Sequence, residues 1–177
     1  VLSNMAGAHI KSYRLIHDMR RSMGFHDTRV SFSLHMCVFV PKNANPVYQR
    51  GASERERLFQ IRPALAMMTG QFRRPYRNLG RDRQGNYSDF HAIDYFTRKT
   101  VDIHSGTDPK GFKSDLGWEI YPKGITACCE SLMRIQPKPI YITGCGVCDL
   151  SDAFRSRFIY EHLREVCRSN LPVKRFY

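Results

Sequence analysis

Apolar residues recur along this chain at two spacings, and each spacing predicts one kind of secondary structure. Spacings of three and four residues predict helices over residues 5–23, 53–69, 122–135 and 151–169. Short apolar runs rich in valine, isoleucine and aromatic residues predict strands over residues 30–40, 90–95, 139–143 and 173–177. Helix and strand therefore alternate from the first predicted helix to the last predicted strand.

Local signals predict where these helices begin, bend and end. Asn4 is the predicted cap of the first helix, and Gly24 is its predicted end. Pro63 lies inside the second helix and predicts a kink or a split, because proline lacks an N–H and clashes with the preceding turn. Ser151 and Asp152 are predicted to open the last helix. The first helix has one apolar face, formed by Ile10, Tyr13, Leu15, Ile16 and Met19.

This alternation predicts an α/β fold with a parallel sheet and helices packed outside it. The carboxyl ends of parallel strands meet at one edge, where the active sites of such folds lie. The pattern of residues fits both an open doubly wound sheet and a part of an eight-fold barrel. A length of 177 residues with 42% hydrophobic content fits a single domain over residues 1–177.

The charge balance is strongly basic, with 28 lysine and arginine residues against 16 acidic ones and a formal net charge of +12. Such a balance favours anionic partners, although basic residues scattered over a solvated surface are the simpler interpretation. Clusters occur at Arg20 and Arg21 and in the segment 73–83, which could bind phosphates. No nucleic-acid-binding motif accompanies them, so nucleic acid is not an expected partner.

Neither a long apolar run nor a basic-then-apolar leader is present, so we expect no membrane association and a cytoplasmic location. The six cysteines are then expected to be reduced thiols.

Cys145 and Cys148 form a Cys-x-x-Cys pair between a predicted strand and a predicted helix, so a thiol redox or metal-binding module is one alternative. The helix starts near residue 151 and not at the first cysteine, which argues against the redox interpretation. A zinc site would need two more ligands. The remaining candidates, which have no characteristic spacing, are Cys128, Cys129, His104 and His162.

Five sequence segments together resemble glycoside hydrolase family 1, the β-glucosidase family. They are AHIKSYRLIHDM (8–19), ALAMMTGQFRRPYR (64–77), YSDFHAIDYFTR (87–98), SDLGWEIYPKGI (114–125) and PIYITGCGVCD (139–149). Their order and spacing over nearly the whole chain carry the resemblance. It implies a (β/α)8 barrel and retaining hydrolysis of β-glucosides or 6-phospho-β-glucosides, with no cofactor.

When these segments are aligned with the family, the chain corresponds to the part of the barrel from helix four to the first residues of strand eight. Barrels of this kind have about 250 residues or more, so the resemblance implies a partial (β/α)8 barrel. The family's Asn-Glu-Pro motif, which supplies the general acid/base, is absent from this sequence. We therefore expect either a decayed copy or a truncated gene product, and a complementing half-barrel chain is an expected partner.

The family's nucleophile is the glutamate of an Ile-Thr-Glu-Asn-Gly motif, and this chain has Ile-Thr-Gly-Cys-Gly at residues 142–146. Gly144 therefore stands at the nucleophile position, and Cys145 replaces an asparagine. Retaining hydrolysis needs two carboxyl groups about 5 Å apart, and glycine has no side chain to supply one. We expect the chain to have no intact catalytic residue and no hydrolytic activity.

The resemblance also implies substrate-binding residues near that edge. The family's Asn-Tyr-Tyr motif has become Asp94, Tyr95 and Phe96, which adds a charge and removes a hydroxyl. Trp118 corresponds to an aromatic wall of the sugar site, with core packing as the alternative, and Glu119 follows it. The predicted substrate-binding residues are Asp94, Phe96, Trp118 and Glu119. A non-catalytic protein that binds polyanions through residues 73–83, or sugars through Trp118, is the remaining alternative.

Overall fold

The computed structural model describes residues 1–102 and 111–177, and every predicted helix and strand has a counterpart there. His104, one of the predicted candidate ligands, lies outside these residues. The elements are α1 (Leu2–Ser22), β1 (Ser33–Pro41), α2 (Pro46–Glu56), a π-helical turn (Arg57–Ile61), α3 (Arg62–Thr69), β2 (His91–Val101), α4 (Lys123–Met133), β3 (Ile140–Gly144), α5 (Arg155–Arg168) and β4 (Val173–Phe176).

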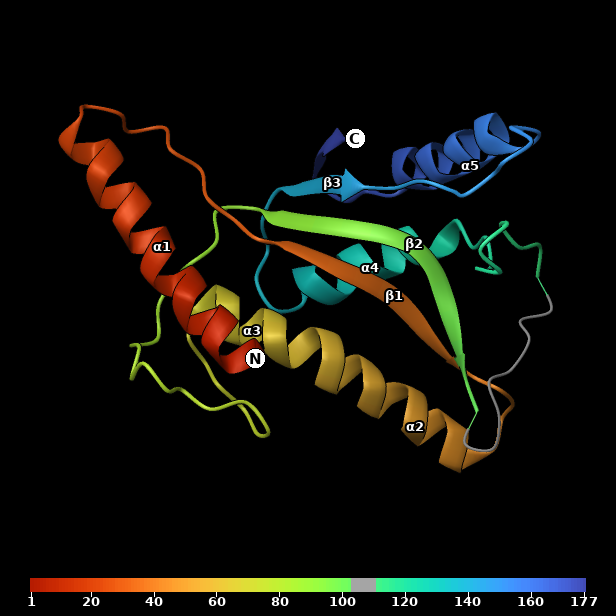
Figure 1. Cartoon of the computed structure of the whole chain (residues 1–177), viewed down its shortest axis with the longest axis horizontal. Coiled ribbons are helices and arrows are strands. Elements are labelled where there is room, and N and C mark those ends of the chain that lie inside the picture. Colours follow the sequence, from red (N-terminus) through yellow and green to blue (C-terminus); the bar gives the residue numbers. More distant parts are fainter. Residues whose placement is uncertain (103–110) are drawn as a thin grey trace.

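Four parallel strands form one sheet in the order β1-β2-β3-β4, which is also their order along the chain (Figure 1). Each strand is joined to the next by a crossover that contains a helix. This succession of neighbouring β-α-β units is the arrangement of a barrel wall, in contrast to a doubly wound sheet, whose strand order reverses. The predicted α/β class and the parallel sheet are confirmed.

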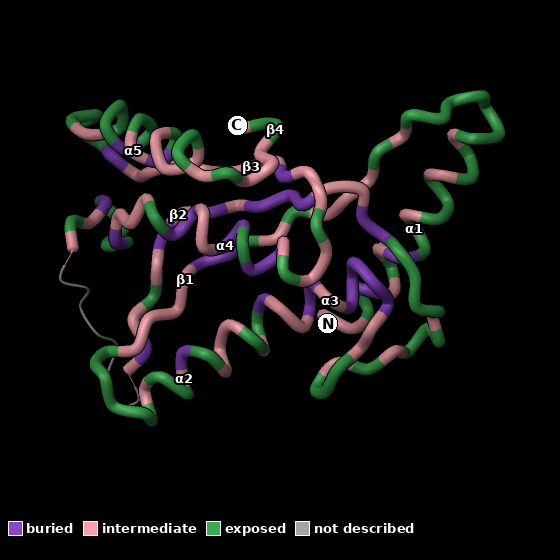
Figure 2. Tube along the Cα trace, turned by 180° about the vertical axis from the view of Figure 1, so that it is seen from behind, coloured by how far each residue is buried: buried purple, intermediate pink, exposed green. Residues whose placement is uncertain are grey.

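One face of the sheet is apolar and covered by helices. On β2, Ile93 and Tyr95 are fully buried, and on β3 Ile140 and Ile142 are as well (Figure 2). They form one core with residues of α3 and α4, among them Ala64, Met68, Ile125, Cys128, Cys129 and Leu132. Full burial of each isoleucine contributes about 1.5–3 kcal/mol, so this face supplies much of the stability.

The opposite face carries the alternate residues of the same strands, because successive side chains of a strand point to opposite sides. Asp94 and Phe96 on β2 are partly exposed, and Ser33 on β1 and Thr143 on β3 are exposed. We call this the concave face, since it corresponds to the inside of a barrel wall. No helix covers it in the described part of the chain.

The first helix differs from its prediction in two ways. It begins at Leu2 without a side-chain cap, so Asn4 lies inside the helix. Of its predicted apolar face only Ile10 is buried, whereas Leu15 is 60% exposed, because the later turns of α1 extend beyond the sheet (Figure 1). The predicted end is confirmed: Gly24 has φ of +85°, and its N–H donates to the Arg21 carbonyl.

The second helix begins earlier than predicted and contains an irregular turn. Asn45 caps it by accepting a hydrogen bond from the Val47 N–H at 2.9 Å, with Pro46 in the first helical position. The π-helical turn precedes Pro63, and the Arg62 N–H reaches back to the Arg57 carbonyl. The predicted disturbance at the proline therefore takes the form of a π turn within a continuous helix.

The last helix begins at Arg155, four residues later than its predicted opening at Ser151. The cap is Asp149, whose carboxylate accepts from the N–H groups of Phe154 at 2.8 Å and Arg155 at 3.0 Å. Asp152 has a positive φ of 55°, which takes it out of helical geometry. The intervening turn therefore separates the capping side chain from the first helical residue.

Candidate functional site

The carboxyl ends of β2 and β3 bring Asp94 and Gly144 directly opposite each other. A Cβ atom added to Gly144 would lie 2.9 Å from Asp94 Oδ1 and 3.2 Å from its Cγ. The carboxylate of Asp94 therefore fills the space into which a side chain at position 144 would extend. Gly144 has no carboxylate of its own, but the neighbouring strand β2 supplies one beside it.

Hydrogen bonds join three strands across the concave face at this point. The Thr143 hydroxyl donates to Asp94 Oδ1 at 2.7 Å, and the hydroxyls of Ser33 and Thr143 are 2.9 Å apart. These side chains come from β2, β3 and β1, and their strands place them on the same face. They form a row of groups that can exchange hydrogen bonds with the hydroxyls of a bound molecule.

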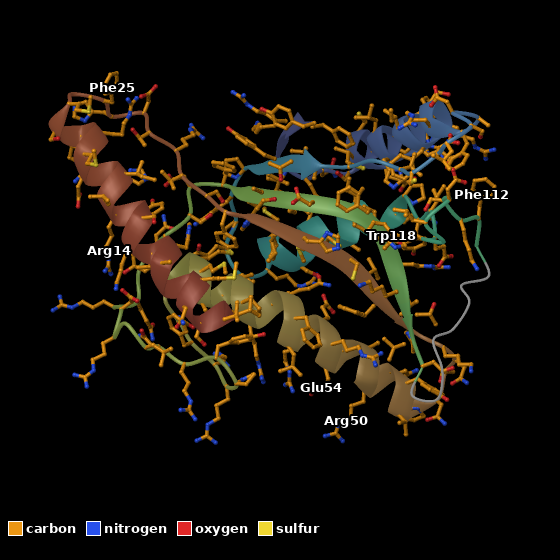
Figure 3. All side chains as sticks on the ribbon, in the orientation of Figure 1. Arg14, Phe25, Arg50, Glu54, Phe112 and Trp118 are labelled. Atoms are coloured by element: carbon orange, nitrogen blue, oxygen red, sulfur yellow. The ribbon has the colours of Figure 1, made fainter. Side chains whose placement is uncertain are left out.

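An aromatic wall continues from this polar row. The rings of His35 and Phe96 are stacked, with centroids 5.5 Å apart, and the Phe96 ring lies 6.1 Å from that of Trp118. Trp118 is 44% exposed and lies beside the carboxyl-terminal part of β2 (Figure 3). A cavity of about 430 Å³ is lined by Phe96, Ser114, Leu116, Trp118, Ile120, Gly146, Val147, Cys148 and Phe158.

A short turn holds Trp118 at the mouth of this cavity. The N–H of Ser114 donates to the Trp118 carbonyl at 2.8 Å, and the Gly117 N–H donates to the Ser114 carbonyl at 2.8 Å. Gly117 has φ of +73°, a conformation that residues with a side chain rarely adopt. The cavity therefore combines an apolar lining with a fixed aromatic ring, as small-molecule sites commonly do.

Glu119 is only 2% exposed, and its carboxylate is occupied within the fold. Arg98 donates to both of its oxygens, to Oε2 at 2.7 Å. This bond to Glu119 is the main cause that raises the pKa of Arg98, and the guanidinium also lies 4.2 Å over the Tyr121 ring. A sugar would reach the Glu119 carboxylate only by displacing Arg98, so its role in substrate binding stays a prediction.

The cysteine pair lies at the same edge in two different environments. Burial raises the pKa of Cys145 to about 12, so this thiol stays protonated at neutral pH. Cys148 lines the cavity, and both are free thiols. In a redox pair, the first cysteine lies at a helix N-terminus, where the helix dipole stabilises its thiolate. Here α5 begins only at Arg155, so Cys145 does not have this position.

The other candidate ligands are held by the fold. Cys128 and Cys129 are buried on α4, and His162 is fully buried, with Nδ1 2.8 Å from the Phe158 carbonyl. Within residues 1–102 and 111–177 no three histidine, cysteine or acidic side chains are grouped so that they could hold a metal ion. His104 falls outside these residues.

Three residues at this site are not among the predicted substrate-binding residues, namely Ser33, His35 and Thr143. Period-two alternation could have identified them, because they alternate with apolar residues along β1 and β3. The close approach of Asp94 to Gly144 could not have been found in this way, since it depends on the register between two strands.

Comparison with solved structures relates this fold to β-glucosidases. A β-glycosidase from Pyrococcus horikoshii matches 99% of this chain and 42% of its own, at 24% identity and a TM-score of 0.79. A family 1 β-glucosidase from Thermotoga maritima matches 99% and 45%, at 17% identity and a TM-score of 0.80. A β-glucosidase from Exiguobacterium marinum matches 96% and 45%, at 17% identity and a TM-score of 0.76.

The chain thus has the fold of part of a glycosidase barrel and spans less than half the length of each of these structures. Neither a protein-family model nor a curated protein sequence matches it. In the described parts of the chain, no helix has the length and apolar character needed to cross a membrane.

Proposed function

We propose that this chain carries the sugar-binding edge of a family-1-like glycosidase barrel, and that it binds β-glucosides without hydrolysing them. The observation that carries the proposal is Gly144 at the carboxyl end of β3, beside the aromatic wall of Phe96 and Trp118. An aromatic face next to a row of hydroxyl and carboxylate groups suits a sugar ring, which has both apolar C–H faces and hydroxyl edges.

Hydrolysis is not expected because the carboxylates near this edge have other partners. Retaining hydrolysis needs a nucleophile and an acid/base about 5 Å apart. Asp94 accepts from Thr143, Asp149 caps α5, and Glu119 is paired with Arg98. In the described residues, this arrangement supports binding and gives no pair of free carboxylates for catalysis.

The proposal includes a complementing half-barrel as a partner. The sheet ends at β1 on one side and at β4 on the other, so both edge strands expose unpaired backbone groups. A second barrel segment would pair with these edges and cover the exposed apolar residues of α1. Each of the β-glucosidases described above is more than twice as long as the part of it that this chain matches. This difference in length supports a missing second segment.

Trp118 is the only tryptophan in the chain, so its fluorescence reports directly on the proposed sugar site. We expect titration with an aryl β-glucoside to shift this emission, because the ligand would displace water from the exposed indole. Calorimetry should show binding lost in Trp118→Ala and retained in Tyr160→Ala, an exposed aromatic residue on α5 outside the cavity. Equal binding by both variants would contradict the proposal.

Hydrolysis is tested with a chromogenic aryl β-glucoside. We expect no release of the aryl group by the unaltered chain or by a Gly144→Glu/Cys145→Asn variant, because neither contains the acid/base of the Asn-Glu-Pro motif. Release by the unaltered chain would show that another carboxylate or thiol acts as the nucleophile, and it would refute the assignment of Gly144.

A further inference from the structure

The segment between α3 and β2 carries an unbalanced positive charge. Residues 71–86 contain five arginines and one acidic residue, Asp82. The Asp82 side chain is only 4% exposed, and Oδ1 lies 3.5 Å from Arg14 of α1, so its charge is directed into the fold. All five arginines are exposed: Arg73, Arg74, Arg77, Arg81 and Arg83. The segment therefore presents cations to solvent without a neighbouring exposed anion of its own.

Hydrogen bonds attach one turn of this segment to three other elements. The Arg62 guanidinium of α3 donates to the Arg74 carbonyl, and the Tyr76 hydroxyl donates to the Leu58 carbonyl of the π turn at 2.6 Å. The Arg77 N–H donates to Ser3 Oγ of α1 at 3.1 Å. The backbone that bears Arg74 and Arg77 is thus held in place before any ligand arrives, which lowers the entropic cost of binding.

Arg62, Arg74 and Arg77 line one hollow together with Pro75, and no acidic residue lines it. Glu54 of α2 interacts electrostatically with Arg62, but its carboxylate is paired with Arg57. Guanidinium groups bind phosphate through two parallel hydrogen bonds and remain charged at any physiological pH. Three of them around one hollow therefore form a site for an anion with several oxygen atoms.

We propose that this hollow binds a phosphate-bearing small molecule. It lies beside α3, the π turn and the start of α1, on the loop that follows α3 (Figure 1), whereas the sugar site lies at the carboxyl ends of β2 and β3. The two sites therefore have no lining residue in common. The phosphate site depends on arginines that take no part in the sugar site, so either proposal can fail without the other.

The test is calorimetric titration of the full chain with inorganic pyrophosphate at low salt. We expect saturable binding of one pyrophosphate per chain, weakened about 100-fold in Arg74→Gln/Arg77→Gln, because each arginine contributes charge-assisted hydrogen bonds. Arg62 is kept, since it also holds the Arg74 carbonyl. The matched control is Lys11→Gln/Arg168→Gln, two exposed cations on α1 and α5, which lowers the net charge by the same amount, from +12 to +10.

Retention of binding in the control variant and its loss in the arginine variant would support the proposal. Equal weakening in both variants would overturn it, because binding would then follow net charge and not the hollow. Binding of a single-stranded oligonucleotide with a steep salt dependence, without binding of pyrophosphate, would also overturn it in favour of an extended polyanion surface. Unchanged thermal unfolding of both variants would show that the fold is preserved.

Discussion

The two faces of the sheet are formed by the same strands but differ in burial and polarity. On the covered face, Ile93, Tyr95 and Ile142 are fully buried among helices. On the concave face, the residues next to them in sequence, Asp94 and Thr143, are hydrogen-bonded to each other and open to solvent. The covered face therefore supplies the core of the fold, and the concave face carries the proposed sugar site. Substitutions on the two faces separate these roles.

The largest expected effect lies on the covered face. Ile93→Ala should lower the free energy of unfolding by about 2–5 kcal/mol, because it removes buried methyl groups and leaves a cavity in a packed core. The control is Thr143→Val on the concave face, which keeps the shape and should cost about 1 kcal/mol. Urea unfolding followed by circular dichroism measures both, and equal losses would refute the distinction between the faces.

Gly144→Glu should have an intermediate effect, because a side chain there meets the carboxylate of Asp94. We expect a loss of about 1–2 kcal/mol as Asp94 turns away from Thr143 and two like charges come together. The double variant Gly144→Glu/Asp94→Asn should recover about 1 kcal/mol of this loss. Additive effects in a double-mutant cycle would show that the two positions are independent.

The smallest expected effect is a dependence of the unfolding free energy on pH, which we expect to come from His162 on α5. Burial lowers the pKa of His162 below its ordinary value of 6.5, and in the described structure Nε2 has no hydrogen-bond partner. The unfolded chain therefore binds a proton at higher pH than the folded chain does. The contribution of His162 to stability should be complete above pH 6.5 and should be lost as the pH decreases below it, by at most about 1.4 kcal/mol per pH unit.

Buried His91 adds to the same slope, since burial lowers its pKa too. His162→Gln should reduce the slope of unfolding free energy against pH between 6.5 and 5. His17→Gln on α1 is the control, because His17 is paired with Asp89 away from this core. An unchanged slope in His162→Gln would show that His162 does not contribute to the pH dependence.

The sequence predicts the elements better than their ends. The order of helices and strands follows from apolar periodicity, and Gly24 ends α1 as predicted. The predicted starts of α2 and α5 were wrong in opposite directions. Asn45 caps α2 well before its predicted opening, whereas α5 begins later than predicted because Asp152 has a positive φ and the Asp149 carboxylate binds the N–H groups of Phe154 and Arg155. Local caps compete with one another, and packing decides which of them is used.

The predicted apolar face of α1 illustrates a different limit. The spacing of its apolar residues correctly predicted a helix. The same spacing gives no information on where that helix lies relative to the sheet. Ile10 packs into the fold, whereas Leu15 and Met19 extend past it. Burial depends on neighbours from distant parts of the chain, which no local pattern describes.

The sequence by itself determined the α/β class, the parallel arrangement and the absence of a side chain at position 144, since these depend on residue types and their spacing. Only the tertiary structure decided that Asp94 occupies the space beside Gly144, that Glu119 is held by Arg98, and that three arginines share one hollow. The physical reason is that strand register and loop attachment bring together residues far apart in the chain. Hydrogen bonds and charges act over distances in space, whatever their separation in sequence.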